Sequence, residues 1–149
     1  MEQIKVFVVS LKSCVERRKY ITAQLKKQNI KFEFFDAIDG RTDDFPLFHK
    51  YNYFKRLWLT SGRMPSKGEL GCYASHYSLW KRCIELNEPI IIIEDDAELV
   101  TGAFSSLKNI AENIQEYGFL RLEAEDKGKL IAQKKQPSFA IHFMYNNFG

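Results

Sequence analysis

Three consecutive acids, Glu94, Asp95 and Asp96, directly follow the apolar run Ile90–Ile93 and are the residues best suited to chemistry. The four isoleucines predict a strand buried on both faces. Adjacent carboxylates repel one another and lose hydration near a protein interior, and a bound divalent cation removes that repulsion. Oxygen ligands suit Mg²⁺ or Mn²⁺, which bind one or two carboxylates together with substrate phosphates. The pattern favours a metal–phosphate site at the carboxyl end of a central strand, although a solvated acidic turn has the same composition.

Two earlier predicted strands, Ile4–Leu11 and Phe32–Phe35, also end in polar residues. Ligands of open α/β sheets bind outside the carboxyl ends of the strands, so we expect all three ends to share a site. If the third strand continues through the acids, Glu94 and Asp96 point to one face and Asp95 to the other. The polar residues around the two earlier ends are Ser10, Leu11, Lys12, Arg17, Arg18, Asp36, Asp39 and Gly40.

Two helices must position these strand ends. Ser13 and Glu16 have the spacing of a capping box, which predicts a helix from there to about Gln28. Strand, helix and strand in this order imply a parallel, right-handed unit. A second helix is predicted over Gly68–Asn87. Its apolar stripe at helical spacing is Leu70, Tyr73, Tyr77, Trp80 and Ile84, and its small residues are Gly68, Gly71, Ala74, Ser75 and Ser78.

The remaining elements are less regular. A short helix is predicted around Leu47–Leu57, another helix over Phe104–Tyr117 and a short strand over Phe119–Leu122. Lys129–Gln133 and Phe139–Met144 are predicted to be a pair of strands. An apolar strand so near the end of the sequence indicates a fold that is incomplete at its C-terminus, and its exposed edge predicts self-association into a homo-oligomer.

Composition narrows the class of protein. The chain has 149 residues, which suits one domain, and a net charge of +3 spread along its length. This distribution argues against a nucleic-acid partner and is compatible with peripheral contact with an anionic membrane. No apolar run is long enough to span a bilayer, and no signal peptide precedes the first strand. The three cysteines lack metal-site spacing and are interpreted as reduced core thiols of a cytoplasmic protein.

Four segments together resemble glycosyltransferase family 25, in the family's order from about Lys5 to Leu99: KVFVVSLKSCVERR, FEFFDAIDG, GELGCYASHYSLW and PIIIIEDDAEL. That family includes bacterial lipopolysaccharide and lipooligosaccharide galactosyltransferases. The resemblance implies a GT-A-like, Rossmann-type α/β fold with a mostly parallel sheet flanked by helices. It implies that residues 1–149 form a single glycosyltransferase domain, the nucleotide-sugar-binding portion. It further implies transfer of a hexose, usually galactose, from a UDP-sugar to a lipooligosaccharide glycan, with Mn²⁺ or Mg²⁺ as cofactor.

The resemblance also implies roles for individual residues. Asp96 and Glu94 would bind the metal and the diphosphate, with Asp95 assisting, while no residue is singled out as the catalytic base. The implied donor-binding residues are Ser10, Leu11 and Arg17 at the uridine and phosphate end, Asp36, Asp39 and Gly40 at the nucleotide, and Glu69, Gly71, Ser75 and His76 at the donor sugar.

Alternatives remain open for the residues and for the whole chain. Arg17 can be a solvated helix charge, Asp36 and Asp39 can shape a turn, and Ser75 and His76 can serve packing. A phosphoacceptor receiver domain also begins with an acidic pair after a strand, but there that strand is the first, whereas two strands precede this one. A catalytically incompetent nucleotide-sugar-binding fragment is the second alternative.

Overall fold

The computed structural model describes residues 4–42, 48–100, 102–122, 129–135 and 140–145. The chain divides into two compact units, Met1–Thr101 and Gly102–Gly149. Each unit is described by itself. Among the residues described, no helix is both long and apolar enough to cross a membrane.

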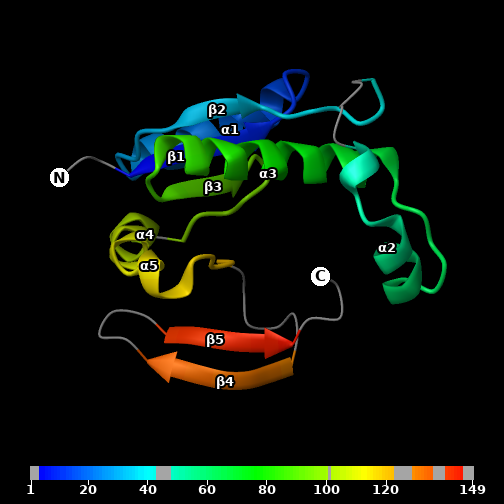
Figure 1. Ribbon diagram of the computed structural model, residues 1–149. Coiled ribbons are helices and arrows are strands. Elements are labelled where there is room, and N and C mark those ends of the chain that lie inside the picture. Colours follow the sequence, from blue (N-terminus) through cyan, green and yellow to red (C-terminus); the bar gives the residue numbers. More distant parts are fainter. Residues whose placement is uncertain (1–3, 43–47, 101, 123–128, 136–139, 146–149) are drawn as a thin grey trace. The chain divides into compact units, whose positions relative to one another are not determined.

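The first unit contains a three-stranded sheet of β1 (Lys5–Ser10), β2 (Glu33–Asp36) and β3 (Ile90–Glu94) in the order β2-β1-β3 (Figure 1). Both pairings are parallel, which confirms the predicted Rossmann-type α/β class. The prediction that the isoleucine strand is central and buried on both faces is wrong for the described sheet. β1 is the middle strand and is buried from Val6 to Ser10, whereas Ile90–Ile92 of β3 are only partly buried.

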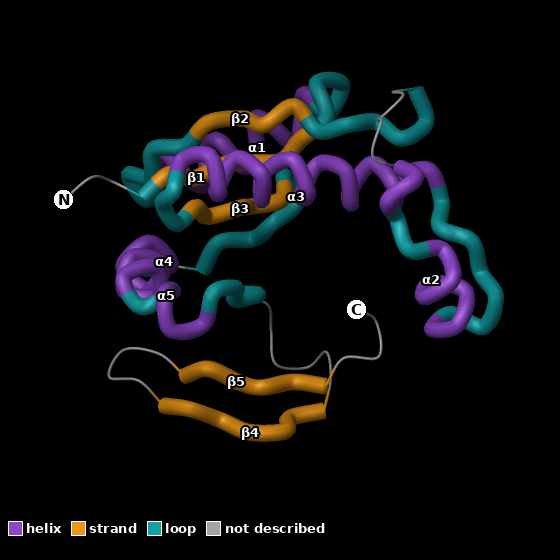
Figure 2. The backbone as a smooth tube through the Cα atoms, in the orientation of Figure 1, coloured by secondary structure: helices purple, strands orange, loops and turns teal. Residues whose placement is uncertain are grey.

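Helices α1 (Val15–Lys27) and α3 (Lys67–Leu86) lie on opposite sides of this sheet (Figures 1 and 2). Leu79 of α3 packs against Phe7 and Val9 on one face of β1. Because side chains alternate along a strand, Val6 and Val8 point to the other face. α1 buries Ile21 and Leu25 completely.

One prediction about how the helices begin is corrected, and a capping box is found at a second helix. The capping box at Ser13 does not form, since Cys14 is the N-cap of α1 without a side-chain hydrogen bond and Glu16 accepts a bond from Lys19. A capping box begins α3 instead, where Ser66 Oγ accepts from the Glu69 amide and the Glu69 carboxylate accepts from the Ser66 amide. The Ser-x-x-Glu spacing occurs at both places in the sequence, and only the one at Ser66 and Glu69 forms a capping box.

The predicted buried stripe of α3 is also wrong. Trp80 and Ile84 are exposed, and the buried residues are Gly71, Ala74, Ser75 and Leu79. The small side of α3 faces inward because the chain at Ile38–Gly40 approaches the helix at backbone distance, as the geometry at Gly71 shows. This close backbone contact leaves no space for large aromatic side chains between α3 and the segment 38–40.

The other elements agree in part with expectation. The segment predicted as one helix contains the 3₁₀ turn η1 (Phe48–Lys50) and α2 (Tyr53–Leu59), which Asn52 caps. In the second unit α4 (Ala103–Glu112) and α5 (Ile114–Tyr117) replace one predicted helix. The two strands β4 (Lys129–Lys135) and β5 (Ala140–Tyr145) pair antiparallel as expected. The predicted strand at 119–122 is absent, and these residues have no regular structure.

Candidate functional site

A cleft opens at the carboxyl ends of β1 and β3, beside the segment that follows β2. The register places Ser10 opposite Asp36 and Val9 opposite Glu94, so the three strand ends lie level with one another. This juxtaposition is the one expected from the sequence. The lining consists of Val9, Ser10, Leu11, Cys14, Arg17, Ala37, Ile38, Asp39, Gly40, Arg41, Gly68, Cys72, Ser75, His76, Glu94, Asp95 and Asp96.

Asp95 anchors the acidic segment to the first strand. It is only 7% exposed, and its Oδ2 accepts a hydrogen bond of 2.6 Å from Ser10 Oγ. Its Oδ1 accepts a bond of 3.3 Å from the Arg17 guanidinium, which raises the pKa of Arg17 above its usual value. β3 ends at Glu94, so strand alternation does not extend to Asp95 and Asp96, which lie in a turn.

Arg18 ties the ends of β1 and β2 together. Its guanidinium donates to Ser10 O at 2.7 Å and to Asp36 Oδ1 at 2.7 Å, and it lies 4.7 Å from the centre of the Phe34 ring. The hydrogen bond from Arg18, followed by that from Lys12, lowers the pKa of Asp36. Asp36 therefore serves as a partner of Arg18 and lines a second hollow next to the cleft rather than the cleft itself.

The segment after β2 is held against α3 by close backbone contact and by the Ser75 hydroxyl. A Cβ on Gly40 would lie 1.9 Å from Lys67 O, and one on Gly71 would lie 2.4 Å from Ile38 O. Ser75 Oγ accepts a bond of 2.9 Å from the Ile38 amide and donates one of 2.8 Å to Gly71 O. Gly71 is thus a packing residue that does not line the cleft, whereas Gly40 and Ser75 do line it.

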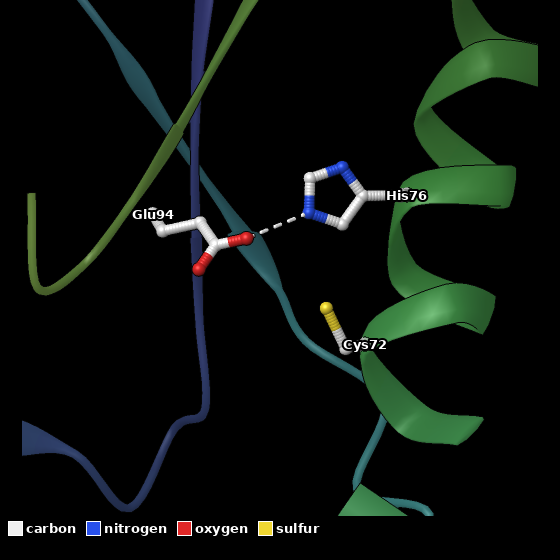
Figure 3. Close-up of side chains that lie close together, drawn as sticks. All are labelled: Cys72, His76 and Glu94. Carbon is white, nitrogen blue, oxygen red and sulfur yellow. Dashed lines mark hydrogen bonds and ion pairs between the residues drawn. The ribbon is translucent and has the colours of Figure 1, made fainter. Parts of the chain in front are cut away.

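One face of α3 brings two further side chains to the cleft. His76 Nε2 lies 3.1 Å from Glu94 Oε1, with Cys72 beside both residues (Figure 3). Hydrogen bonds with Cys72 and then with Glu94 raise the pKa of His76 to about 9, so the ring is an imidazolium at neutral pH. The assignment of all cysteines to the core is wrong for Cys72, which is exposed, while Cys14 and Cys83 are partly buried.

Most of the predicted donor-binding residues meet in the cleft. The exceptions are Asp36 and Gly71, described above, and Glu69, whose carboxylate is held by the Ser66 amide and by Arg56. Glu69 is not among the lining residues because its capping role directs it to the start of α3. Cys72 is one of the lining residues that the sequence analysis does not identify, together with Cys14, Arg41 and Gly68. The position of Cys72 four residues before His76 is the available signal.

The acidic turn offers one carboxylate suited to a hard divalent cation. The Asp96 side chain is 64% exposed, and Arg17 lies 3.9 Å from it. Ser10 and Arg17 already bind Asp95, while Glu94 is paired with His76. A site with one carboxylate completed by phosphate oxygens and water is a usual arrangement for Mg²⁺ and related ions. The turn therefore fits a divalent cation whose other ligands come from outside the protein.

Removing the Asp95 carboxylate should destabilise the first unit. In Asp95→Ala the buried Ser10 hydroxyl loses its 2.6 Å acceptor and retains only the longer contact of 3.3 Å with Leu11 O. We expect a loss of about 1–3 kcal/mol in the free energy of unfolding. Urea denaturation followed by circular dichroism measures this loss. Asp96→Ala is the matched control, with an expected change below about 0.5 kcal/mol because that side chain is exposed. Equal losses in the two variants would contradict the anchoring role of Asp95.

Comparison with known proteins places this chain among glycosyltransferases. The family model described as "Glycosyltransferase family 25 (LPS biosynthesis protein)" matches residues 3–148. The lipooligosaccharide biosynthesis protein lic2B of Haemophilus influenzae is 37% identical over 99 residues, which is 65% of this chain and 35% of lic2B. Procollagen galactosyltransferase 2 of Homo sapiens is 28% identical over 143 residues, which is 92% of this chain and 22% of that protein.

A third relative is named as an inactive glycosyltransferase. The human protein named "Inactive glycosyltransferase 25 family member 3" is 30% identical over 122 residues, which is 74% of this chain and 19% of that protein. The chain thus spans well under half of the length of each of these relatives. Because the family model covers nearly the whole chain, this chain belongs to glycosyltransferase family 25.

Proposed function

We propose that the cleft binds a UDP-sugar and that the whole protein transfers a hexose, galactose, to a lipopolysaccharide or lipooligosaccharide glycan. The observation that carries the proposal is the meeting of three strand ends around Arg17 and the acidic turn, in a chain of this family. The description of the family and the name of lic2B support the acceptor class. The name of the human procollagen enzyme supports galactose as the sugar.

The side chains of the cleft have distinct tasks in this proposal. Arg17 stays charged and lies next to Asp95 and Asp96, where it can contact a diphosphate. Asp96 would hold Mn²⁺ or Mg²⁺, and Glu94 lies two residues earlier at the end of β3, paired with His76. The cation would supply Lewis-acid stabilisation of the charge that develops on the leaving UDP. Ser10 and Leu11 at the end of β1 form the wall proposed for the uridine end.

A transferase assay tests the proposal. The protein is incubated with UDP-galactose, UDP-glucose or UDP-N-acetylglucosamine, with and without MnCl₂, and with lipooligosaccharide as acceptor. We expect Mn²⁺-dependent transfer that is fastest from UDP-galactose. Transfer of another sugar would overturn the choice of galactose. Absence of UDP binding to the protein under all these conditions would overturn the donor site itself.

The alternative is a nucleotide-sugar-binding fragment without transferase activity. It is supported by the name of one relative, which describes that protein as inactive. The same experiment separates the two, because a fragment binds UDP in calorimetry with Mn²⁺ and yields no glycosylated acceptor. Transfer at any measurable Mn²⁺-dependent rate would exclude it.

We also propose that the protein works in the cytoplasm, at the inner face of the membrane that carries its acceptor. α2 supports this proposal because Phe54 is 82% exposed and Trp58 is 91% exposed on a helix that also carries the exposed Lys55. Exposed aromatic rings beside basic side chains are typical of surfaces that bind anionic membranes.

The contribution of this surface can be measured with vesicles. Trp58→Ala is expected to lower binding to phosphatidylglycerol vesicles by about threefold to tenfold, because interfacial burial of the indole is lost. Co-sedimentation gives the bound fraction. Trp80→Ala on α3 is the control, with an expected binding equal to that of the unchanged protein. Equal loss in both variants, or no binding of the unchanged protein, would contradict the membrane role of α2.

A further inference from the structure

We propose that Cys72, His76 and Glu94 form a binding site for Zn²⁺, separate in chemistry from the proposed donor cation. The inference does not depend on the proposed function, because it rests on the positions of three side chains. Each of them offers one ligand atom, and these atoms all lie within 4.8 Å of one another. In the part of the chain that the structure describes, this is the one trio of Cys, His, Asp or Glu ligands that converges in this way.

The scaffold brings these three ligands together before any metal binds. Cys72 and His76 are four residues apart on α3, so their side chains leave the same face of the helix one turn apart. Glu94 is the last residue of β3, and the pairing of β3 with β1 places Glu94 opposite Val9. Figure 3 shows the three side chains converging from the helix and the strand into one space.

The distances suit a tetrahedral ion. Zinc binds sulfur at about 2.3 Å and nitrogen or oxygen at about 2.0–2.2 Å, so two of its ligand atoms lie roughly 3.3–3.7 Å apart. The His76 and Glu94 atoms are already 3.1 Å apart. Small rotations of these partly solvated side chains would be enough to enclose the ion.

The chemistry of the trio selects the metal. A thiolate, an imidazole and a carboxylate form a mixed soft and hard ligand set, which Zn²⁺ prefers and Mg²⁺ does not. Three protein ligands leave a fourth position, which faces the cleft because all three residues line it. The acidic turn at Asp96, in contrast, offers oxygen alone.

A metal at this position would join α3 to the end of β3. Binding replaces the proton on the Cys72 thiol and any proton on His76 Nε2, and both protons pass to the buffer. The unfolded chain does not hold the three ligands together, so binding favours the folded state. We therefore expect Zn²⁺ to raise the midpoint of thermal unfolding.

Cobalt serves as a spectroscopic probe for this site. Titration of the full chain with CoCl₂, without nucleotide, is expected to produce the thiolate-to-cobalt charge-transfer absorption at one ion per chain. Zn²⁺ added afterwards should remove this absorption. Cys72→Ser is expected to abolish the band and to weaken Zn²⁺ binding by at least about tenfold in calorimetry, because the sulfur ligand is lost. Cys72 is exposed, so this variant should fold.

Cys83→Ser is the matched control, since Cys83 lies on the same helix and its thiol donates to Glu88 O at 3.2 Å outside the trio. This control should retain the cobalt band and the Zn²⁺-dependent rise in the unfolding midpoint. Glu94→Gln should retain the thiolate band with weaker binding. The proposal is overturned if the unchanged protein shows no cobalt–thiolate band, or if the band survives Cys72→Ser. Binding of Mn²⁺ with UDP is a separate measurement, so the failure of either site can be distinguished.

Discussion

Asp96→Ala is expected to weaken Mn²⁺-dependent binding of UDP by at least about a hundredfold, which corresponds to about 2.7 kcal/mol. The reason is that two of the three carboxylates at the acidic turn already have protein partners. Asp95 is held by Ser10 and Arg17. Glu94 is exposed but paired with His76, so Asp96 is the carboxylate best placed to bind a cation. Because such ions often use only one or two protein carboxylates, the loss of one removes most of the protein's share of the coordination.

Calorimetric titration of UDP in the presence and absence of MnCl₂ measures this effect. Glu98→Ala is the matched control, because Glu98 is an exposed acid near the same turn that does not line the cleft. UDP binding to this control should equal that of the unchanged protein. Binding of UDP to Asp96→Ala that is unchanged and independent of the metal would refute the assignment of Asp96.

Gly71→Ala is expected to destabilise the protein by roughly 2–3 kcal/mol, since its new Cβ would overlap a neighbouring backbone. That carbon would lie 2.4 Å from Ile38 O and 2.7 Å from the Gly40 amide nitrogen. Backbone atoms cannot rotate away as a flexible side chain can, so either α3 or the segment after β2 must shift. The shift also moves Gly40 and Asp39, which line the cleft, and UDP binding should weaken as well.

Gly68→Ala is the control, and we expect it to increase the stability of the protein instead of lowering it. A Cβ on Gly68 would lie 3.8 Å from Ser66 Oγ, which is an ordinary contact. Alanine is the better helix former, so we expect a gain of up to about 0.5–1 kcal/mol. Chemical denaturation of both variants measures the two changes. Similar effects at Gly68 and Gly71 would contradict the close approach of α3 to the segment after β2.

The parallel α/β sheet and the edge at which the cleft opens were predictable from the sequence, whereas the order of the strands was not. β-Branched runs identified β1 and β3, and the polar residues after each strand indicated where a ligand would bind. This worked because parallel strands carry their carboxyl ends to one edge of the sheet, whatever the detailed packing. Ser10, Arg17 and the acidic turn therefore meet as expected.

The inner face of α3 was not predictable from hydrophobic spacing. Its aromatic stripe has the helical period, yet Trp80 is exposed while Ala74 and Ser75 are buried. Periodicity shows which residues share a face but not which face lies against another backbone. That choice depends on the approach of Gly40 to Gly71, a contact between segments about thirty residues apart.

A short sequence motif did not predict the local structure where the same motif occurs twice in the chain. The spacing of Ser13 and Glu16 matched a capping box, but the same spacing at Ser66 and Glu69 is the one that forms. The family resemblance implies a donor-sugar role for Glu69, whereas its carboxylate is held at the start of α3. The spacing between the cysteines favours a core position for Cys72, whereas its spacing to His76 points to the cleft.

The buried hydrogen bond between Ser10 and Asp95 has a consequence for affinity. It holds the first residue of the acidic turn in place in the absence of any ligand. Ordering a loose loop during association costs about 0.5–1.5 kcal/mol for each side chain immobilised. Here part of that entropy is lost when the chain folds, so a nucleotide bound as proposed would meet a turn whose first residue is already held in place. Weakening this bond should therefore speed the dissociation of a bound nucleotide even where every atom that touches it is retained.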